Sequence, residues 1–377
     1  MSEAHLEANY SMRQSRLAQA LQAANLEAMV LNAGPSLTYL TGLHFHLSER
    51  PVVGLFTPDL SPVIILPELE TGKLSNLPYP VQSFAYGEDP GTWQVVFQEG
   101  IQAAQCAGGQ VGIEPRCMRV LEMGFLEGAG SSIKFLPGEA YMAELRMQKD
   151  EAELATMQTA VNIAQNTLEA ILPEIKLGMT ERALAAEITV GLLREGSESQ
   201  IPFAPIVASG PNSANPHAFP SDRQLQKGDL LIIDWGANVG GYFSDLTRTF
   251  AIGEVDDELQ RIAQIVLEAN EAARMIAGPG VAAEDVDHAA RQVIEDGGYG
   301  EFFIHRTGHG LGMEVHEEPY IRAGNSFPLT PGMTFTIEPG IYLPGRGGVR
   351  IEDDVVITEH GLRSLSDMPR ELRLIGG

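Results

Sequence analysis

The stretch LQKGDLLIIDWG at residues 225–236 has a counterpart later in the chain, LTPGMTFTIEPG at residues 329–340. The two align without a gap at a separation of 332 − 228 = 104 residues, and leucine, glycine and isoleucine recur at matching places. A helical segment opened by glycine precedes each copy, at residues 176–188 and 278–290. A unit of this length is too long for a solenoid repeat. The duplication therefore predicts a pseudo-two-fold domain in which two equivalent hairpins face a shared centre.

Each predicted hairpin carries a pair of acidic residues. In the first copy the turn midpoint is (234 + 245)/2 = 239.5, which predicts that Asp234 lies opposite Asp245. In the second copy (338 + 352)/2 = 345 falls in the middle of the turn LPGRGG, so Glu338 is predicted opposite Glu352. Directly opposed residues have Cβ atoms about 4.5–5.5 Å apart, and like charges placed so are destabilising. Two such pairs at matching places in a repeat indicate a bound cation.

A surface location is the usual fate of an aspartate or glutamate on a strand. Asp234 and Glu338, however, interrupt the apolar runs LLII and FTI, which are typical of buried strands. A buried carboxylate must be paired or bound to a metal. The set of four acids therefore favours a metal site over a solvated surface.

A histidine in a glycine-rich stretch completes the candidate site. His309 lies between two glycines in FFIHRTGHGLGMEVHEEP at residues 302–319, where small neighbours permit close approach. One imidazole with four carboxylates suits Mn²⁺, Co²⁺, Fe²⁺ or Zn²⁺. Two such ions about 3.5–4 Å apart could share Asp245 and Glu352, acidify a bridging water and polarise an amide carbonyl. The pattern predicts metal-assisted hydrolysis.

Composition excludes several other classes of protein. The 377-residue chain has a formal charge of −25, so roles at nucleic acids and anionic membranes are disfavoured. Its two cysteines, Cys106 and Cys117, provide no disulfide framework and no zinc-finger spacing. The sequence has no transmembrane run of about 18 apolar residues and no secretory signal pattern at its start. We expect a soluble, cytoplasmic protein.

The chain is predicted to contain two domains, residues 1–145 and 146–377. The first alternates helical and β-rich segments, which predicts a small α/β domain. Its predicted helix covers residues 11–24, and its predicted strands fall within residues 28–31, 38–43, 51–58, 61–68, 110–114 and 133–138. A long amphipathic helix at residues 149–171, with acids in its first turn, opens the second domain.

Several of these motifs resemble the M24 metallopeptidase family, in its Xaa-Pro aminopeptidase and prolidase branch. The matching segments are DWGANVGGYFSDLTRTF (234–250), GHGLGMEVHEEP (308–319), EPGIY (338–342) and VRIEDDVVIT (349–358). SLTYLTGLHFHLSERPVVGLF (36–56) resembles the creatinase/prolidase N-terminal domain. The resemblance implies an α+β fold: a "pita-bread" catalytic domain with a curved antiparallel sheet and flanking helices, preceded by a creatinase-like domain.

The resemblance also implies roles for individual residues. The implied metal ligands are Asp234, Asp245, His309, Glu338 and Glu352. Glu338 is further implied to assist proton transfer, His217 to bind the substrate carbonyl or carboxylate, and His316 to donate to the scissile-bond oxygen. His305 is a candidate pocket residue, and Arg350, on one strand face with Glu352, is a candidate to orient a ligand carboxylate or bind a substrate terminus.

The implied activity is hydrolysis of Xaa-Pro peptide bonds by attack of a hydroxide that bridges two divalent ions, with manganese expected and cobalt, zinc or iron as alternatives. The implied substrates are short proline-containing peptides, and the implied assembly is a homodimer. Some prolidases carry an arginine directly after their HE-x-P motif, where this chain has Tyr320, so dipeptidase and aminopeptidase action both stay open. His44 and His46 alternate along a strand-like segment and are expected at the surface.

Other activities on the same fold stay as alternatives. A methionine aminopeptidase shares the GHG-x-G motif and the ligands but not an N-terminal domain of this size. A carboxypeptidase-like specificity also stays open. A creatinase-type amidinohydrolase, or a binding protein without catalysis, predicts lost ligands, and none is lost here. A dehydrogenase would need a G-x-G-x-x-G turn between a strand and a helix, a context that GHGLGMEV does not provide.

Overall fold

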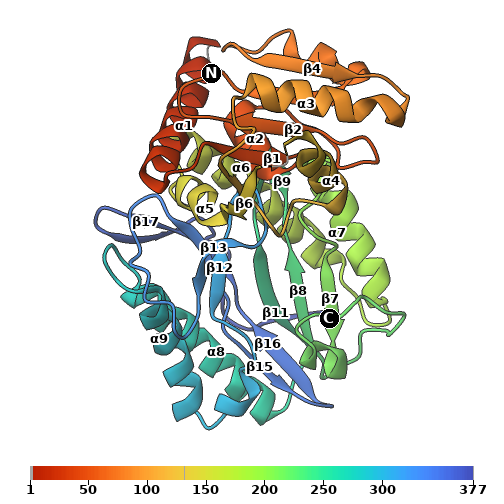
Figure 1. Ribbon diagram of the computed structural model, residues 1–377. Coiled ribbons are helices and arrows are strands. Elements are labelled where there is room, and N and C mark those ends of the chain that lie inside the picture. Colours follow the sequence, from red (N-terminus) through yellow and green to blue (C-terminus); the bar gives the residue numbers. More distant parts are fainter. Residues whose placement is uncertain (1–2, 131, 377) are drawn as a thin grey trace. The chain divides into compact units, whose positions relative to one another are not determined.

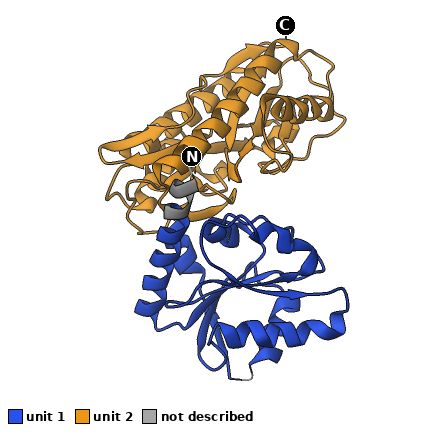
Figure 2. Cartoon of the chain, turned by 90° about the horizontal axis from the view of Figure 1, so that it is seen from above, with its two compact units in different colours: residues 1–146 blue, residues 147–377 orange. Residues whose placement is uncertain are grey.

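The computed structural model describes residues 3–130 and 132–376. The chain forms two compact units, residues 1–146 and 147–377, which Figure 2 colours separately. Each unit combines helices with β-sheet, as Figure 1 shows. This mixed content agrees with the α+β class predicted from the sequence.

One six-stranded sheet organises the first unit, with strand order β4-β3-β2-β1-β5-β6. Its strands are β1 Ala28–Asn32, β2 Val53–Phe56, β3 Val63–Pro67, β4 Gln82–Tyr86, β5 Gln110–Ile113 and β6 Lys134–Pro137. The helices of this part of the chain are α1 Glu3–Ala24, α2 Pro35–Thr41, α3 Trp93–Ala103, α4 Val120–Ala129 and α5 Glu139–Met147. Phe97 of α3 and Leu126 of α4 pack on Val30 and Ile65 of the sheet, which closes an apolar core.

The predicted strand at residues 38–43 is wrong, because this segment belongs to helix α2. Pro35 occupies the first turn, where its fixed φ suits a helix, and Gly42 ends the helix at φ 73° with its N–H bonded to the Thr38 carbonyl. Pro35 and Gly42 therefore favour a helix here, although the residues between them are of types common in strands. His44 and His46 follow in an irregular, exposed segment instead of a strand.

The second unit contains two main sheets, each built around the hairpin of one half of the duplication, with strand orders β19-β11-β8-β7 and β13-β12-β14-β17-β18. The first sheet consists of β7 Ile206–Ser209, β8 Leu230–Trp235, β11 Leu246–Ile252 and β19 Arg373–Ile375. The second consists of β12 Gly308–Gly310, β13 Glu317–Ile321, β14 Thr334–Ile337, β17 Asp353–Thr358 and β18 Gly361–Ser364. A bridge between Thr247 and Glu352 joins the two sheets, with the Glu352 N–H donating to the Thr247 carbonyl at 3.0 Å.

Two helices belong to each half of this unit: α6 Glu151–Ile171 and α7 Glu181–Glu195, then α8 Asp257–Ile276 and α9 Ala283–Asp296. The long helix predicted from residue 149 is confirmed as α6, and Asp150 and Glu153 form a capping box at its start. Helices α8 and α9 lie side by side (Figure 1). Ile262 and Val266 of α8 pack with Phe335 and Val355 of the second sheet in one apolar core.

The register of the first hairpin differs from the prediction by two residues. Asp234 pairs with Thr247, and the small ladder of β9 Asn238–Val239 with β10 Tyr242–Phe243 continues the same register. The turn is centred between Gly240 and Gly241, whose φ angles are 57° and 78°. A two-residue hairpin turn with positive φ at both positions favours glycine, which occupies both places here. The turn midpoint therefore lies one residue later than the predicted 239.5. Asp234 and Asp245 are therefore diagonal neighbours across the hairpin.

The second hairpin follows the predicted register. Ile337 pairs with Asp353 at the end of the β14–β17 ladder, and Gly340 pairs with Arg350 where β15 Gly340–Leu343 meets β16 Gly347–Arg350. Both pairs have the same register, which places Glu338 opposite Glu352 between the two ladders. Among the described residues, no helix is long and apolar enough to cross a membrane.

Candidate metal centre

A cavity of about 440 Å³ opens between the two halves of the second unit. It is lined by all five residues predicted as metal ligands: Asp234, Asp245, His309, Glu338 and Glu352. It is also lined by the four other residues predicted for the site: His217, His305, His316 and Arg350. The structure thus brings together every residue that the sequence singled out for chemistry.

Strands and strand ends hold the five acidic and imidazole groups. Asp234 lies near the end of β8, Asp245 directly precedes β11, and His309 is the central residue of β12. Glu338 directly follows β14, and Glu352 directly precedes β17. Because each half of the duplication contributes one hairpin, the carboxylates approach one another from both sheets.

The side-chain donors converge closely. One ligand atom each from Asp245, His309 and Glu352 lie within 4.8 Å of one another, and all three residues are buried. The His309 Nε2 lies 3.3 Å from Glu338 Oε1 and 3.7 Å from Asp245 Oδ2. These are the separations of groups that surround a common point, as ligands do around an ion.

The electrostatics of the cavity confirm that its acids crowd one another. Burial and the neighbouring Glu352 and Asp234 raise the pKa of Asp245 well above its usual value. Burial, Glu338 and Asp234 do the same to the pKa of Glu352. Burial raises the pKa of Glu338 to about 7, although Arg350 opposes this. Burial also lowers the pKa of His309 well below its usual value, so this imidazole is neutral. The four acids of the cavity therefore carry more negative charge than the neighbouring basic groups balance.

The donor set fits a carboxylate-rich metal centre. Asp234 Oδ1 is buried without a hydrogen-bond partner, while its Oδ2 accepts from Arg350 at 2.6 Å. An unpaired buried oxygen costs free energy unless a partner arrives. Four carboxylates and one neutral imidazole offer oxygen and nitrogen donors of the kind that Mn²⁺ and its neighbours accept. The residues that would hold ions are therefore the five predicted ones.

The Arg350 side chain is buried beside these acids and makes four polar contacts with other described residues. Its Nη2 donates to Asp234, its Nε donates to the Thr247 hydroxyl at 3.0 Å, and its Nη1 donates to the Tyr342 hydroxyl at 3.1 Å and the Pro216 carbonyl at 3.4 Å. The Thr247 hydroxyl in turn donates to Glu352 Oε2 at 2.6 Å. Arg350 therefore orients Asp234 directly and Glu352 through Thr247.

A chain of hydrogen bonds links Arg350 to His305. The His305 Nε2 lies 2.8 Å from the Tyr342 hydroxyl, and its Nδ1 lies 2.7 Å from the Arg306 carbonyl. A carbonyl only accepts, so Nδ1 carries the proton and Nε2 accepts from Tyr342. Burial lowers the pKa of His305 to about 4, which is consistent with a neutral ring. His305 therefore connects the segment before β12 with Tyr342 of β15.

His316 and His217 line the same cavity, and they differ in their surroundings. The His316 ring packs edge-on against the His309 ring, with centroids 4.1 Å apart. Partial burial, Arg306 and His217 lower the pKa of His316 to about 4. His217 is exposed on the loop after β7, and its backbone N–H donates to Asn215 Oδ1 at 3.1 Å. Both imidazoles face the cavity and are available to a bound molecule.

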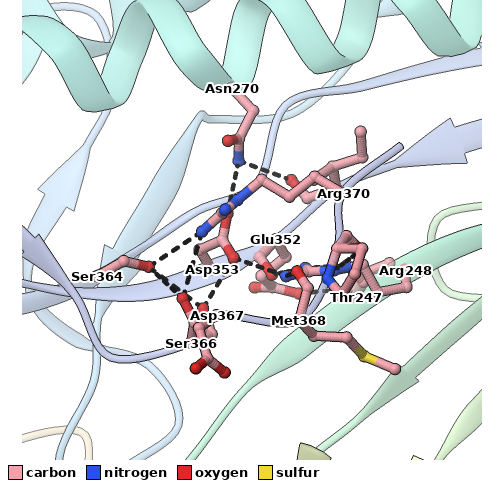
Figure 3. A network of polar contacts seen from close by, with 12 residues as sticks. Thr247, Arg248, Asn270, Glu352, Asp353, Ser364, Ser366, Asp367, Met368 and Arg370 are labelled. Carbon is pink, nitrogen blue, oxygen red and sulfur yellow. Dashed lines mark hydrogen bonds and ion pairs between the residues drawn. The ribbon is translucent and has the colours of Figure 1, made fainter. Parts of the chain in front are cut away.

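A buried polar network holds the main chain at Glu352 and the side chain of Asp353 (Figure 3). Arg248 donates to the Glu352 carbonyl at 2.7 Å and to Asp353 Oδ1 at 2.8 Å. Arg370 and Asn270 donate to Asp353 Oδ2 at 2.6 Å and 3.2 Å. Burial alone would raise the pKa of Asp353, but Arg248 and Arg370 lower it to about 2. This network links Arg248, in the first repeat, to Glu352 and Asp353 in the second.

Three contributors were missed in the sequence. Thr247, two residues after Asp245, shares its strand face by alternation, which was an available signal. Asp354 occupies the matching place in the second repeat, and its Oδ2 accepts from the Asp245 N–H at 3.0 Å. Tyr342 carried no signal, because a tyrosine in an apolar hairpin is most often part of the core. Its hydroxyl nevertheless connects Arg350 with His305.

The fold and the site together define a class, namely a duplicated catalytic domain with a carboxylate-rich metal centre and an additional N-terminal domain. Comparison with known proteins specifies the family. Residues 155–359 match metallopeptidase family M24, and residues 13–148 match the creatinase/prolidase N-terminal domain. The chain belongs to metallopeptidase family M24, which confirms the resemblance, the fold and the enzymatic class inferred from the sequence.

Full-length relatives support this assignment. The chain is 39% identical over 374 residues to a probable dipeptidase PepE of Mycobacterium bovis, covering 97% of this chain and 96% of the relative. It is 33% identical over 365 residues to an Xaa-Pro dipeptidase of Lactobacillus helveticus, covering 97% and 99%. The crystal structure of a prolidase from Thermococcus sibiricus superposes with a TM-score of 0.91 at 36% identity, covering 97% and 99%.

Metal affinity is expected to rise with pH. The pKa of Glu338 is raised to about 7 and those of Asp245 and Glu352 well above their usual values, so an arriving cation must displace protons. The pKa values of His305, His309 and His316 are lowered, so these imidazoles are already neutral near pH 6 and do not compete. Each displaced proton changes the affinity by about tenfold per pH unit.

Calorimetric titration of metal-stripped protein with Mn²⁺ measures this effect. At about pH 6, in buffers of different ionisation enthalpy, we expect release of at least one proton per chain. An affinity independent of pH between about 5.5 and 7.5 would contradict the crowding of acids described above.

Proposed function

We propose that this metallopeptidase hydrolyses the peptide bond between an N-terminal residue and proline in short peptides, as an Xaa-Pro dipeptidase or aminopeptidase. We further propose two divalent ions, manganese first, bound by Asp234, Asp245, His309, Glu338 and Glu352. The observation that carries the proposal is the convergence of these five donors in one cavity. The curated relatives named as Xaa-Pro dipeptidases support the choice of substrate.

When bound, the ions supply a Lewis acid for the scissile carbonyl and acidify a water molecule. Glu338 then acts as the proton carrier. Its carboxylate takes a proton as the water oxygen attacks the carbonyl carbon, and delivers it to the proline nitrogen as the carbon–nitrogen bond breaks. A carboxylate beside the attacking water can take the proton in the first half of the reaction and return it in the second.

The neighbouring histidines stabilise the developing charge. Because the lowered pKa of His316 keeps its imidazole neutral, this group donates a hydrogen bond to the scissile oxygen without giving up its proton. In this proposal His217, which is exposed on the loop after β7, contacts the substrate carbonyl or carboxylate. Arg350 orients Asp234, and His305 lines the pocket and supports its wall.

The cavity walls are suited to a proline ring. Pro202, Phe203, Phe219, Pro220 and Val315 provide apolar surface from three separate segments. Proline lacks an N–H and has a fixed φ, so its recognition depends on shape and apolar contact. The acidic floor and the apolar walls together accommodate a short peptide with its scissile bond at the metal centre.

Product analysis tests this function. Metal-stripped protein is incubated with Ala-Pro, Ala-Pro-Ala and Ala-Ala in the presence of Mn²⁺, Co²⁺ or Zn²⁺, and free alanine and proline are quantified. We expect cleavage before proline, loss of activity with chelator and little cleavage of Ala-Ala. Full activity in the chelated sample, or equal cleavage of Ala-Ala, would reject the proposal.

A further inference from the structure

Arg306 provides a positive charge in the cavity that the mechanism above does not use. It directly precedes Thr307 in the segment before β12, and it lines the cavity together with the acidic donors. Its charge acts to lower the pKa values of His309, His316 and Glu338, so it is close to the reacting centre.

The main chain on both sides of Arg306 is firmly held. Arg291 donates to the His305 carbonyl at 2.9 Å. The Thr307 N–H and hydroxyl donate to Asp287 Oδ1 at 3.0 Å and 2.8 Å. Asp287 is itself buried in an ion pair with Arg291. The backbone of Arg306 therefore has a fixed place at the cavity wall.

The guanidinium group of Arg306 stacks on an aromatic ring. It lies over the Tyr320 ring, 4.5 Å from the centroid. Within residues 3–130 and 132–376, no carboxylate forms an ion pair with it, in contrast to Arg350 and Arg248, which contact Asp234 and Asp353. A stacked guanidinium keeps its N–H donors directed outward in its own plane, where they match the two oxygens of a carboxylate.

Tyr320 directly follows the segment HEEP at residues 316–319. The guanidinium of Arg306, in the segment before β12, lies over the Tyr320 ring. In an Xaa-Pro dipeptide the free carboxylate is only two bonds from the leaving nitrogen, so it must lie within the metal cavity. In a longer peptide the same place is taken by an uncharged amide.

We propose that Arg306 binds the C-terminal carboxylate of the substrate, and that the site consequently selects Xaa-Pro dipeptides over longer peptides. This inference rests on the proposed Xaa-Pro hydrolysis. Arg306 is therefore a specificity-determining residue, whose removal affects substrates with a carboxylate directly on the proline and spares those without it.

The test compares Ala-Pro, Ala-Pro amide and Ala-Pro-Ala as substrates of the Mn²⁺-loaded enzyme. The wild-type enzyme is expected to prefer Ala-Pro over its amide. In Arg306→Met, KM for Ala-Pro should rise about 10- to 100-fold with kcat changed less, because a hydrogen bond to a charged group is lost. Turnover of Ala-Pro amide should stay within about twofold, since no such bond exists to lose. Arg306→Lys keeps the charge without the planar fork and should give an intermediate KM.

Arg322→Met is the matched control. Arg322 is exposed, and its Nη1 donates to the Ala323 carbonyl, so this variant should behave as the wild type. Equal losses on Ala-Pro and its amide, or no loss on either, would overturn the role of Arg306 while leaving Xaa-Pro hydrolysis intact. Glu-Pro is assayed as a fourth substrate, and a loss in Arg306→Met confined to Glu-Pro would assign the guanidinium to the N-terminal side chain and overturn the role as well. A wild-type enzyme that cleaves none of these peptides would reject the proposed function itself.

Discussion

Replacement of Asp245 by alanine is expected to reduce hydrolysis of Ala-Pro by about 1,000-fold or more, because a metal centre contributes several kcal/mol to stabilising the transition state. Asp245 is 4% exposed and provides one of the three donor atoms that lie within 4.8 Å of one another. Its loss therefore removes a predicted shared ligand. Steady-state kinetics with saturating Mn²⁺ measure the effect, and calorimetry on the same sample measures the metal bound.

The fold of this variant should persist. The carboxyl group of Asp245 has a raised pKa in a crowd of acids, so its removal relieves repulsion. Thermal unfolding of the metal-free variant should thus occur at or above the temperature of the metal-free wild type. Glu254→Gln, an exposed acid beyond β11, is the matched control and should retain full activity. Unchanged activity in Asp245→Ala would remove this residue from the site.

Replacement of Asp353 by alanine is expected to destabilise the second unit by about 3–5 kcal/mol, the usual cost of leaving a buried charge without its partner. The Arg248 side chain is 2% exposed, and Asp353 is its carboxylate partner. The lowered pKa of Asp353 means that this stabilisation is present above about pH 4 and is lost as the pH falls through about 2. At neutral pH the full effect should be observed.

Tryptophan fluorescence can follow this unit alone. The chain has two tryptophans, and Trp235 is buried in β8 with its Nε1 donating to the Ala164 carbonyl, whereas Trp93 belongs to the first unit. Urea unfolding in a Trp93→Phe background therefore reports on the second unit. Asp222→Asn, which breaks the exposed pair with Arg182, is the control and should leave the urea midpoint almost unchanged. An equally small loss in Asp353→Ala would show that the network in Figure 3 contributes little stability.

Internal duplication is the reason why much of the site was predictable from the sequence. The aligned segments at 225–236 and 329–340 identified two hairpins, and the acids within apolar runs indicated burial. Asp234 and Glu338 do lie in one cavity with Asp245, His309 and Glu352. Their roles as ligands stay predictions. The second hairpin followed the simple midpoint rule because its longer turn is symmetric about residue 345.

Other features depend on geometry that the residue pattern did not specify. The first hairpin shifted by two residues because its turn requires positive φ at Gly240 and Gly241. Helix α2 replaced a predicted strand because Pro35 and Gly42 define its ends. The contacts of Tyr342 and Arg306 arise from the packing of separate segments, so the local spacing of residues does not predict them.

Calorimetric titration of metal-stripped protein with Mn²⁺ at about pH 8, where protons compete less with the ions than at pH 6, tests the central claim most directly. The account predicts two ions bound per chain, at least one of them lost in Asp245→Ala, and hydrolysis of Ala-Pro that appears as the sites fill. Binding of no ion, or stripped protein that cleaves Ala-Pro at the full rate, would contradict it.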